Sequence, residues 1–158
     1  MGWWSEGIMD GDTPMDWEGT ISDAIGGSFR QGRYVFSRQK LEANLIKATT
    51  IIDNARHDRK IGWQVLGVMA LRVGAQLPDS VKSVIIKSAE EDDWAAQDNR
   101  IRKAHMRDLI EKILNHKPGK RVEVPSKALL DLAQKEIVRE QYGPVRVGVA
   151  AVLRRGGK

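Results

Sequence analysis

The stretch 61–74 restricts the fold of this 158-residue chain more than any other part of the sequence. It is apolar at nearly every position, so a helix built from it presents apolar side chains on almost all sides. Such a helix is stable in water only when other elements surround it. The apolar run is too short to cross a bilayer and is interrupted by Gln64 and Arg72. The sequence therefore predicts a central, enclosed helix and no membrane association.

Five further stretches have apolar residues at helical spacing and are expected to pack around the central helix. Their apolar faces are Trp17, Ile21, Ala24 and Ile25; Leu41, Leu45, Ala48, Ile52 and Ala55; Val81, Val84 and Ile85; Ile101, His105, Leu109 and Ile113; and Leu129, Leu132, Ala133 and Ile137. Residues 120–124 alternate with a period of two, which predicts a short strand. The predicted fold is mainly α, a compact bundle of about six helices with at most two short strands.

Capping residues place the ends of several of these helices. Thr13 and Pro14 are typical of a helix that begins at Pro14, and Gly26-Gly27 is typical of its end. Ser37 is a suitable N-cap for one continuous helix to residue 55. Pro118-Gly119 is expected to end the helix that contains Leu109, and Pro125-Ser126 to begin the last one.

The N-terminal segment 1–13 is rich in tryptophan and glycine and is expected to be irregular. Because adjacent residues of an extended chain point to opposite sides, one of Trp3 and Trp4 is expected to pack inward and the other to lie nearer solvent. The sequence shows no domain boundary, so residues 1–158 are predicted to form one helical domain. Residues 143–158 form a basic C-terminal arm, for which an edge strand, a docked arm and a flexible tail remain open.

The N-terminal block also resembles the opening of small bacterial and phage proteins grouped as domain of unknown function 4259. The resemblance rests on six positions: Gly2, Trp4, Gly7, Asp12, Asp16 and Trp17. The stretches 61–66, 77–78 and 90–94 are similar to the helical body of those proteins. The chain departs from the pattern at Ser5, Met9 and Gly11. The resemblance implies a mostly α fold and a bacterial or phage source, and it implies no activity and no catalytic residue.

Charge is distributed unevenly along the chain. Residues 1–29 contain six acids and no Lys or Arg, whereas the other 129 residues contain 26 bases and 15 acids. The basic part is a candidate surface for an acidic partner. Arg100, Lys103 and Arg107 share one helix face, and Lys120 and Arg121 are expected in the next turn. A solvated face is the simpler interpretation of these cations, followed by a protein interface and then by phosphate binding.

No motif of a known enzyme class is present. The chain lacks cysteine, and its three histidines, His57, His105 and His116, are too scattered to form a recognisable ligand set. His105 lies on an apolar stripe and is expected to be a hydrogen-bonded core residue. We expect no catalytic residue, no metal and no cofactor.

Two acidic clusters have structural interpretations. The acids of the N-terminal block do not match a calcium loop, so capping and turn formation are favoured for Asp10, Asp12, Asp16 and Glu18. Residues 90–93 are expected to form a solvated helix boundary, in which Asp92 or Asp93 caps a helix that starts at Trp94.

These observations favour a cytoplasmic, non-enzymatic accessory or inhibitor protein that binds another protein, with a phage-encoded inhibitor of a host factor as the more specific form. The alternative is an accessory protein that binds nucleic acid through the basic helix face and tail. The candidate interaction surface comprises Trp3, Trp4, Arg100, Lys103, Arg107, Lys120, Arg121, Arg154 and Arg155.

Overall fold

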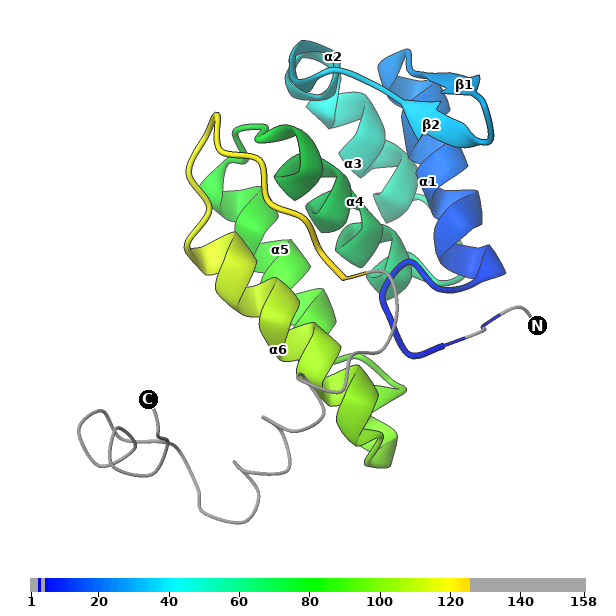
Figure 1. Ribbon diagram of the computed structural model, residues 1–158, viewed down its shortest axis with the longest axis vertical. Coiled ribbons are helices and arrows are strands. Elements are labelled where there is room, and N and C mark those ends of the chain that lie inside the picture. Colours follow the sequence, from blue (N-terminus) through cyan, green and yellow to red (C-terminus); the bar gives the residue numbers. More distant parts are fainter. Residues whose placement is uncertain (1–2, 4, 126–158) are drawn as a thin grey trace.

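The computed structural model describes residue 3 and residues 5–125 of the chain, and Figure 1 shows its arrangement. The elements, in order, are α1 (Asp12–Ile25), β1 (Ser28–Arg30), β2 (Arg33–Val35), α2 (Arg38–Ala43), α3 (Leu45–Asp53), α4 (Arg59–Val73), α5 (Asp79–Glu90), the single 3-10 turn η1 (Ala95–Gln97) and α6 (Arg100–Leu114). The prediction of a mainly α fold with at most two short strands is confirmed. No helix in the described ranges is both long and apolar enough to span a bilayer.

Helix α4 occupies the centre, as the sequence predicted. Every residue from 62 to 71 is buried. Figure 1 shows α1 and α3 on one side of α4 and α5 and α6 on the other, and α4 contacts all four. One hydrophobic cluster extends through the described part of the chain from Ile8 to Val124.

Two antiparallel strands, which the sequence analysis did not predict, follow α1. Strands β1 and β2 pair with Phe29 opposite Tyr34 and Arg30 opposite Arg33. The intervening residues Gln31 and Gly32 both have positive φ, at 52° and 79°. That conformation is the one that a two-residue hairpin turn requires. The Tyr34 ring packs against Gly19 of α1, where an added Cβ would lie 2.6 Å from the hydroxyl oxygen.

The strand predicted at residues 120–124 does not form. The segment is extended, but it lies along the C-terminal end of α4 and pairs with no strand among the described residues. Val122 N donates to Leu71 O at 2.8 Å, and Gly119 N donates to Gly74 O at 2.8 Å. Leu71 lies in the last turn of α4 and Gly74 is its C-cap, so the segment bonds to carbonyls at the C-terminal end of this helix instead of pairing with a strand.

The start of α1 differs from the prediction. The helix begins at Asp12, two residues before Pro14, and Gly11 is its N-cap. Gly11 is extended and forms an isolated bridge with Trp3, which fixes the chain before Thr13 is reached. Thr13 is therefore inside the helix and is not its cap. Gly26 ends the helix in the left-handed conformation, as predicted.

The helix predicted from Ser37 to residue 55 is divided into α2 and α3. Ser37 is the N-cap of α2, as predicted, because its side chain accepts from Lys40 N at 3.1 Å. The division falls at Asn44, whose backbone is non-helical and whose side chain donates to Ile25 O and Lys40 O. An amide that bonds to backbone carbonyls in this way competes with helix continuation.

Three smaller predictions also need correction. Val84 is 39% exposed and does not face inward. Helix α6 ends at Leu114, four residues before Pro118. The helix expected to begin at Trp94 is only η1, although Asp92 does accept from the backbone N–H of Ala95.

The helix predicted after Pro125-Ser126 and the arm 143–158, with Arg154 and Arg155, lie outside the described residues.

Candidate functional site

A buried arginine links three distant parts of the chain. Arg102 of α6 is 1% exposed, and its two terminal nitrogens and Nε all donate hydrogen bonds. Nε and Nη2 bind the two oxygens of Asp92 at 3.2 and 2.9 Å, and Nη2 also binds Gln64 Oε1 at 3.1 Å. Nη1 donates to the carbonyls of Glu6 and Gly7 at 3.2 and 3.3 Å. The five N–H donors of a guanidinium are thus matched by five acceptor contacts.

Two indole rings flank this guanidinium. The Trp3 and Trp94 centroids are 5.3 Å apart, with an angle of 72° between the ring planes. The Arg102 guanidinium carbon lies 5.0 Å from the Trp3 centroid and 5.2 Å from the Trp94 centroid. Both rings are therefore in cation–π contact with the same internal cation. Trp3 packs against this internal cation, whereas Trp4 lies outside the described residues, so the prediction that the two rings point to opposite sides stays a prediction.

The carboxylate of Asp92 completes the charge pairing. Burial alone raises the pKa of Asp92, but the hydrogen bonds and charge of Arg102, with the Ala95 N–H and Gln64, outweigh this effect and hold the pKa below its usual value. Gln64 also donates to Asp92 Oδ2 at 3.0 Å and to Ser88 O at 3.2 Å. The arginine and the carboxylate are both charged, and their polar atoms are occupied by one another and by the backbone.

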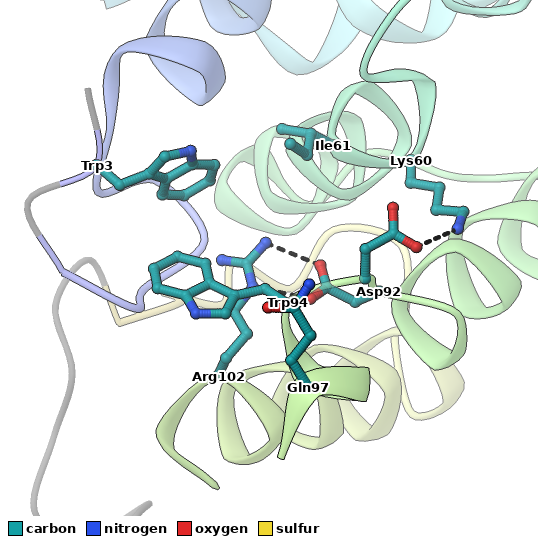
Figure 2. A pocket seen from close by; sticks show the side chains of 8 residues that line it. Trp3, Lys60, Ile61, Asp92, Trp94, Gln97 and Arg102 are labelled. Atoms are coloured by element: carbon teal, nitrogen blue, oxygen red, sulfur yellow. Dashed lines mark hydrogen bonds and ion pairs between the residues drawn. The ribbon is translucent and has the colours of Figure 1, made fainter. Parts of the chain in front are cut away.

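A pocket of about 360 Å³ opens beside this network. It is lined by Trp3, Lys60, Ile61, Asp92, Asp93, Trp94, Gln97 and Arg102. Figure 2 shows the two indoles on one side, with Ile61 and Lys60 across the opening. At the rim, Lys60 Nζ forms an ion pair with Asp93 Oδ1 at 3.0 Å. The pocket thus combines apolar walls with polar groups that already have partners.

The acidic run 90–93 was interpreted correctly for three of its four residues. Glu90, Glu91 and Asp93 are exposed, whereas Asp92 is buried in the arginine network. In the N-terminal block, Asp10 is also buried and accepts a hydrogen bond from the Ser5 hydroxyl. No group of three or more potential metal ligands comes together within residues 5–125.

His105 is a core residue, as predicted, but the predicted hydrogen bond is absent. The side chain is fully buried, and neither ring nitrogen has a hydrogen-bond partner in the described structure. Burial, followed by the charge of Arg102, lowers the pKa of His105, although nearby Asp10 and Asp108 act in the opposite direction. His116 differs because its Nε2 lies 2.6 Å from Ala75 O, which requires the ring to donate there.

The predicted basic surface is divided between two ends of the molecule. Arg100, Lys103 and Arg107 share α6, and the last two line a second pocket of about 340 Å³ beside α5. All three have interactions with other groups of the protein. Lys120 and Arg121 do not extend this face, because the chain leaves α6 at Leu114 and turns back to Gly74 at the C-terminal end of α4.

Sequence reasoning missed Arg102 and Gln64 as participants in a site. A signal was present in both cases. Arg102 precedes Leu109 and Ile113 by seven and eleven residues, which places it in phase with the apolar stripe of α6. Gln64 was noted only as an interruption of the apolar run. A charged or amide side chain on a buried stripe indicates a partner, although the sequence does not say which one.

Comparison with known proteins found no match to a family model, a curated protein or a solved structure.

Proposed function

We propose that this protein binds another protein without catalysis, and that the pocket between Trp3, Trp94 and Ile61 receives an apolar side chain of the partner. The observation that carries this proposal is the aromatic wall of the pocket, combined with a polar floor whose groups are already paired. Aromatic pockets of this kind are typical of the anchor positions at which a few side chains supply most of the binding energy.

The chemistry of the pocket favours an uncharged side chain. A ligand cation would compete with Arg102, which already interacts with both indole rings. A ligand anion would find the guanidinium fully engaged with Asp92, Gln64 and two carbonyls. The volume, about 360 Å³, is at the lower end of the range for ligand pockets, which suits one or two side chains.

The sequence alone supports the kind of protein that we propose, an accessory or inhibitor protein of bacterial or phage type. The resemblance of the N-terminal block to domain of unknown function 4259, which rests on positions such as Gly7 and Asp12, supports that form. A host factor is accordingly the proposed target.

The test fills the pocket without disturbing its floor. Gln97 is exposed at the pocket opening, so Gln97→Trp should occupy the space that the partner side chain needs. Gln39→Trp on α2, also at an exposed position, is the matched control. Peptides that bind the wild type are first selected from a random displayed library. They are then synthesised with a fluorescent label, and their binding to the wild type, Gln97→Trp and Gln39→Trp is measured by anisotropy titration.

We expect selected peptides to share an apolar anchor and to bind Gln97→Trp at least tenfold more weakly than the wild type and Gln39→Trp. Retained binding to Gln97→Trp would place the interface elsewhere. A selection that yields no binding peptide would overturn the proposed function.

A further inference from the structure

Residues 24–41 and residues 117–122 both carry bases and no acids. Residues 24–41 contain four cations, and residues 117–122 contain three. They are Arg30, Arg33, Arg38, Lys40, Lys117, Lys120 and Arg121. The first stretch contains the hairpin and the start of α2, and the second is the turn after α6. We call these seven residues the basic end.

The structure brings the two stretches to one end of the molecule. A Cβ added at Gly119 would lie 3.2 Å from Arg38 Nη1, so the turn after α6 touches the start of α2. Lys40 Nζ donates to Gly26 O at 2.7 Å, which joins α2 to the end of α1, two residues before the hairpin. Figure 1 shows the hairpin, α2 and the turn after α6 along the upper side of the molecule, with α2 between the other two.

The hairpin presents two like charges directly opposite one another. Arg30 pairs with Arg33 across the strands, and both residues are exposed. Alternation along the strands puts these side chains on the face opposite Tyr34, which packs against Gly19. Neither arginine side chain has a hydrogen bond or an ion pair with another residue in the described ranges. Like charges directly opposite destabilise an antiparallel pair, and a bound anion would remove that cost.

The nearby carboxylates do not neutralise this surface. Glu42 accepts from Arg38 Nε at 2.7 Å and from Gln76 N at 2.7 Å. Its carboxylate is therefore paired near the C-terminal end of α2 and does not neutralise the hairpin arginines. Asp23, in the last turn of α1, is exposed, and no ion pair joins it to either hairpin arginine. The basic end therefore carries a clear excess of positive charge.

We propose that the basic end binds the phosphodiester backbone of nucleic acid, with Arg30 and Arg33 as its principal phosphate contacts. A guanidinium matches a phosphate with two parallel hydrogen bonds, and a two-stranded ribbon fits the major groove of a duplex. Cations spread over a hairpin, a helix start and a turn suit an extended chain of phosphates better than one isolated anion.

The basic end and the aromatic pocket are separate. The pocket lies at the N-terminal end of α4, beside Lys60 and Ile61. The turn after α6 instead binds Gly74, at the C-terminal end of α4. A helix of 15 residues extends about 22 Å. Loss of one activity is therefore distinguishable from loss of the other.

The test compares two charge-matched double variants in the full-length protein. Arg30→Gln/Arg33→Gln removes the hairpin cations, and Arg100→Gln/Arg107→Gln removes the same charge from α6. Each is titrated by anisotropy against a labelled 20-base-pair duplex and a labelled 20-nucleotide single strand, as DNA and as RNA, at 50, 100 and 200 mM salt. Circular dichroism checks that all variants fold. A labelled poly-glutamate of equal charge is the control ligand.

We expect the wild type to bind nucleic acid with micromolar affinity at 50 mM salt and poly-glutamate at least tenfold more weakly. The hairpin variant should bind nucleic acid at least about tenfold more weakly than the wild type. On the duplex, the slope of its log K against log salt concentration should be smaller in magnitude by about 1.8. The α6 variant should keep the larger slope. The proposal would be overturned if the two variants lost the same affinity for nucleic acid, or if the wild type bound poly-glutamate as tightly as nucleic acid. It would also be overturned if the wild type showed no measurable binding to nucleic acid.

Discussion

Arg102 illustrates how one buried charge can organise a site without touching a ligand. Desolvation of the guanidinium and of Asp92 costs free energy, which the ion pair recovers only with good geometry and with every remaining donor satisfied. The acceptors from Gln64, Glu6 and Gly7 meet that condition. Because two of these acceptors are backbone carbonyls near Trp3, the arginine also fixes the N-terminal segment against α6.

Removal of Arg102 should therefore be strongly destabilising. We expect Arg102→Met to lower the free energy of unfolding by about 3–5 kcal/mol, because it leaves Asp92 buried without its partner. Arg121→Met, at an exposed position, is the matched control and should change it by less than about 0.5 kcal/mol. Urea denaturation measures both. Equal midpoints for the two variants would show that the buried pair does not support the fold.

His105 should make stability depend on pH. Its pKa is lowered in the folded protein, whereas the unfolded chain takes up a proton at about pH 6.5. The free energy of unfolding should therefore be highest above that pH and should decrease, by at most about 1.4 kcal/mol per pH unit, as the pH falls toward the lowered value. Asp92, whose pKa is also lowered, loses its contribution only below about pH 3.9.

His105→Leu separates this contribution from the rest. We expect the difference in unfolding free energy between pH 7.5 and pH 5.0 to be smaller in His105→Leu than in the wild type, whatever the absolute stability of the variant. Urea denaturation at the two pH values measures it. If the two proteins lose the same free energy over this interval, the buried imidazole is not the titrating group.

At the scale of elements, α4 is expected to be the least tolerant helix. Leu66 is fully buried, so Leu66→Ala should lower the free energy of unfolding by about 2–5 kcal/mol. Leu114, at the end of α6, is 65% exposed, and Leu114→Ala provides the same chemical change outside the core. Thermal or urea unfolding measures the difference, and similar losses in both variants would contradict the central position of α4.

Ser37, which caps α2, and Thr13, which the sequence predicted as a cap, provide a second comparison. Ser37→Ala removes an oxygen that accepts from Lys40 N, and we expect it to lower the free energy of unfolding by about 1 kcal/mol. Thr13→Ala should cost less than half of that, because Gly11 and not Thr13 is the cap of α1. Urea denaturation measures both variants. A larger loss at Thr13 would favour the helix start that the sequence predicted.

Periodicity predicted the elements that bury an apolar face, and it could not predict features that depend on tertiary contacts. The face of α4 and the cap at Ser37 follow from local chemistry, and both are confirmed. The break at Asn44 depends on a carbonyl of α1, which no local pattern reveals. The hairpin escaped notice because its Gln-Gly turn is a weaker signal than Asn-Gly or Asp-Gly.

The candidate site was predictable only in part. Trp3 and the cations of α6 were identified as surface candidates, but the floor of the pocket consists of Arg102 of α6 and Asp92 of the loop after α5. Gln64 of α4, buried behind them, binds both. Which buried polar groups pair with one another depends on how helices are placed, and a single sequence does not contain that information directly.

For the molecule as a whole, the described residues share one hydrophobic cluster, which includes Ile21 of α1, Trp63 of α4 and Leu109 of α6. We therefore expect a single cooperative unfolding transition. Tryptophan fluorescence and far-ultraviolet circular dichroism, recorded on the same urea series, should give coincident curves. Separated midpoints would indicate that part of the structure unfolds independently.

The contacts between Arg102 and the carbonyls of Glu6 and Gly7 join residues that are 96 and 95 positions apart. During synthesis, residues 3–7 leave the ribosome before α6 does, so the side chain that binds their carbonyls is made later. Until then the Trp3 ring lacks its contact with the Arg102 guanidinium. The pocket, which both Trp3 and Arg102 line, is therefore complete only after α6 has been synthesised and has packed against the N-terminal segment.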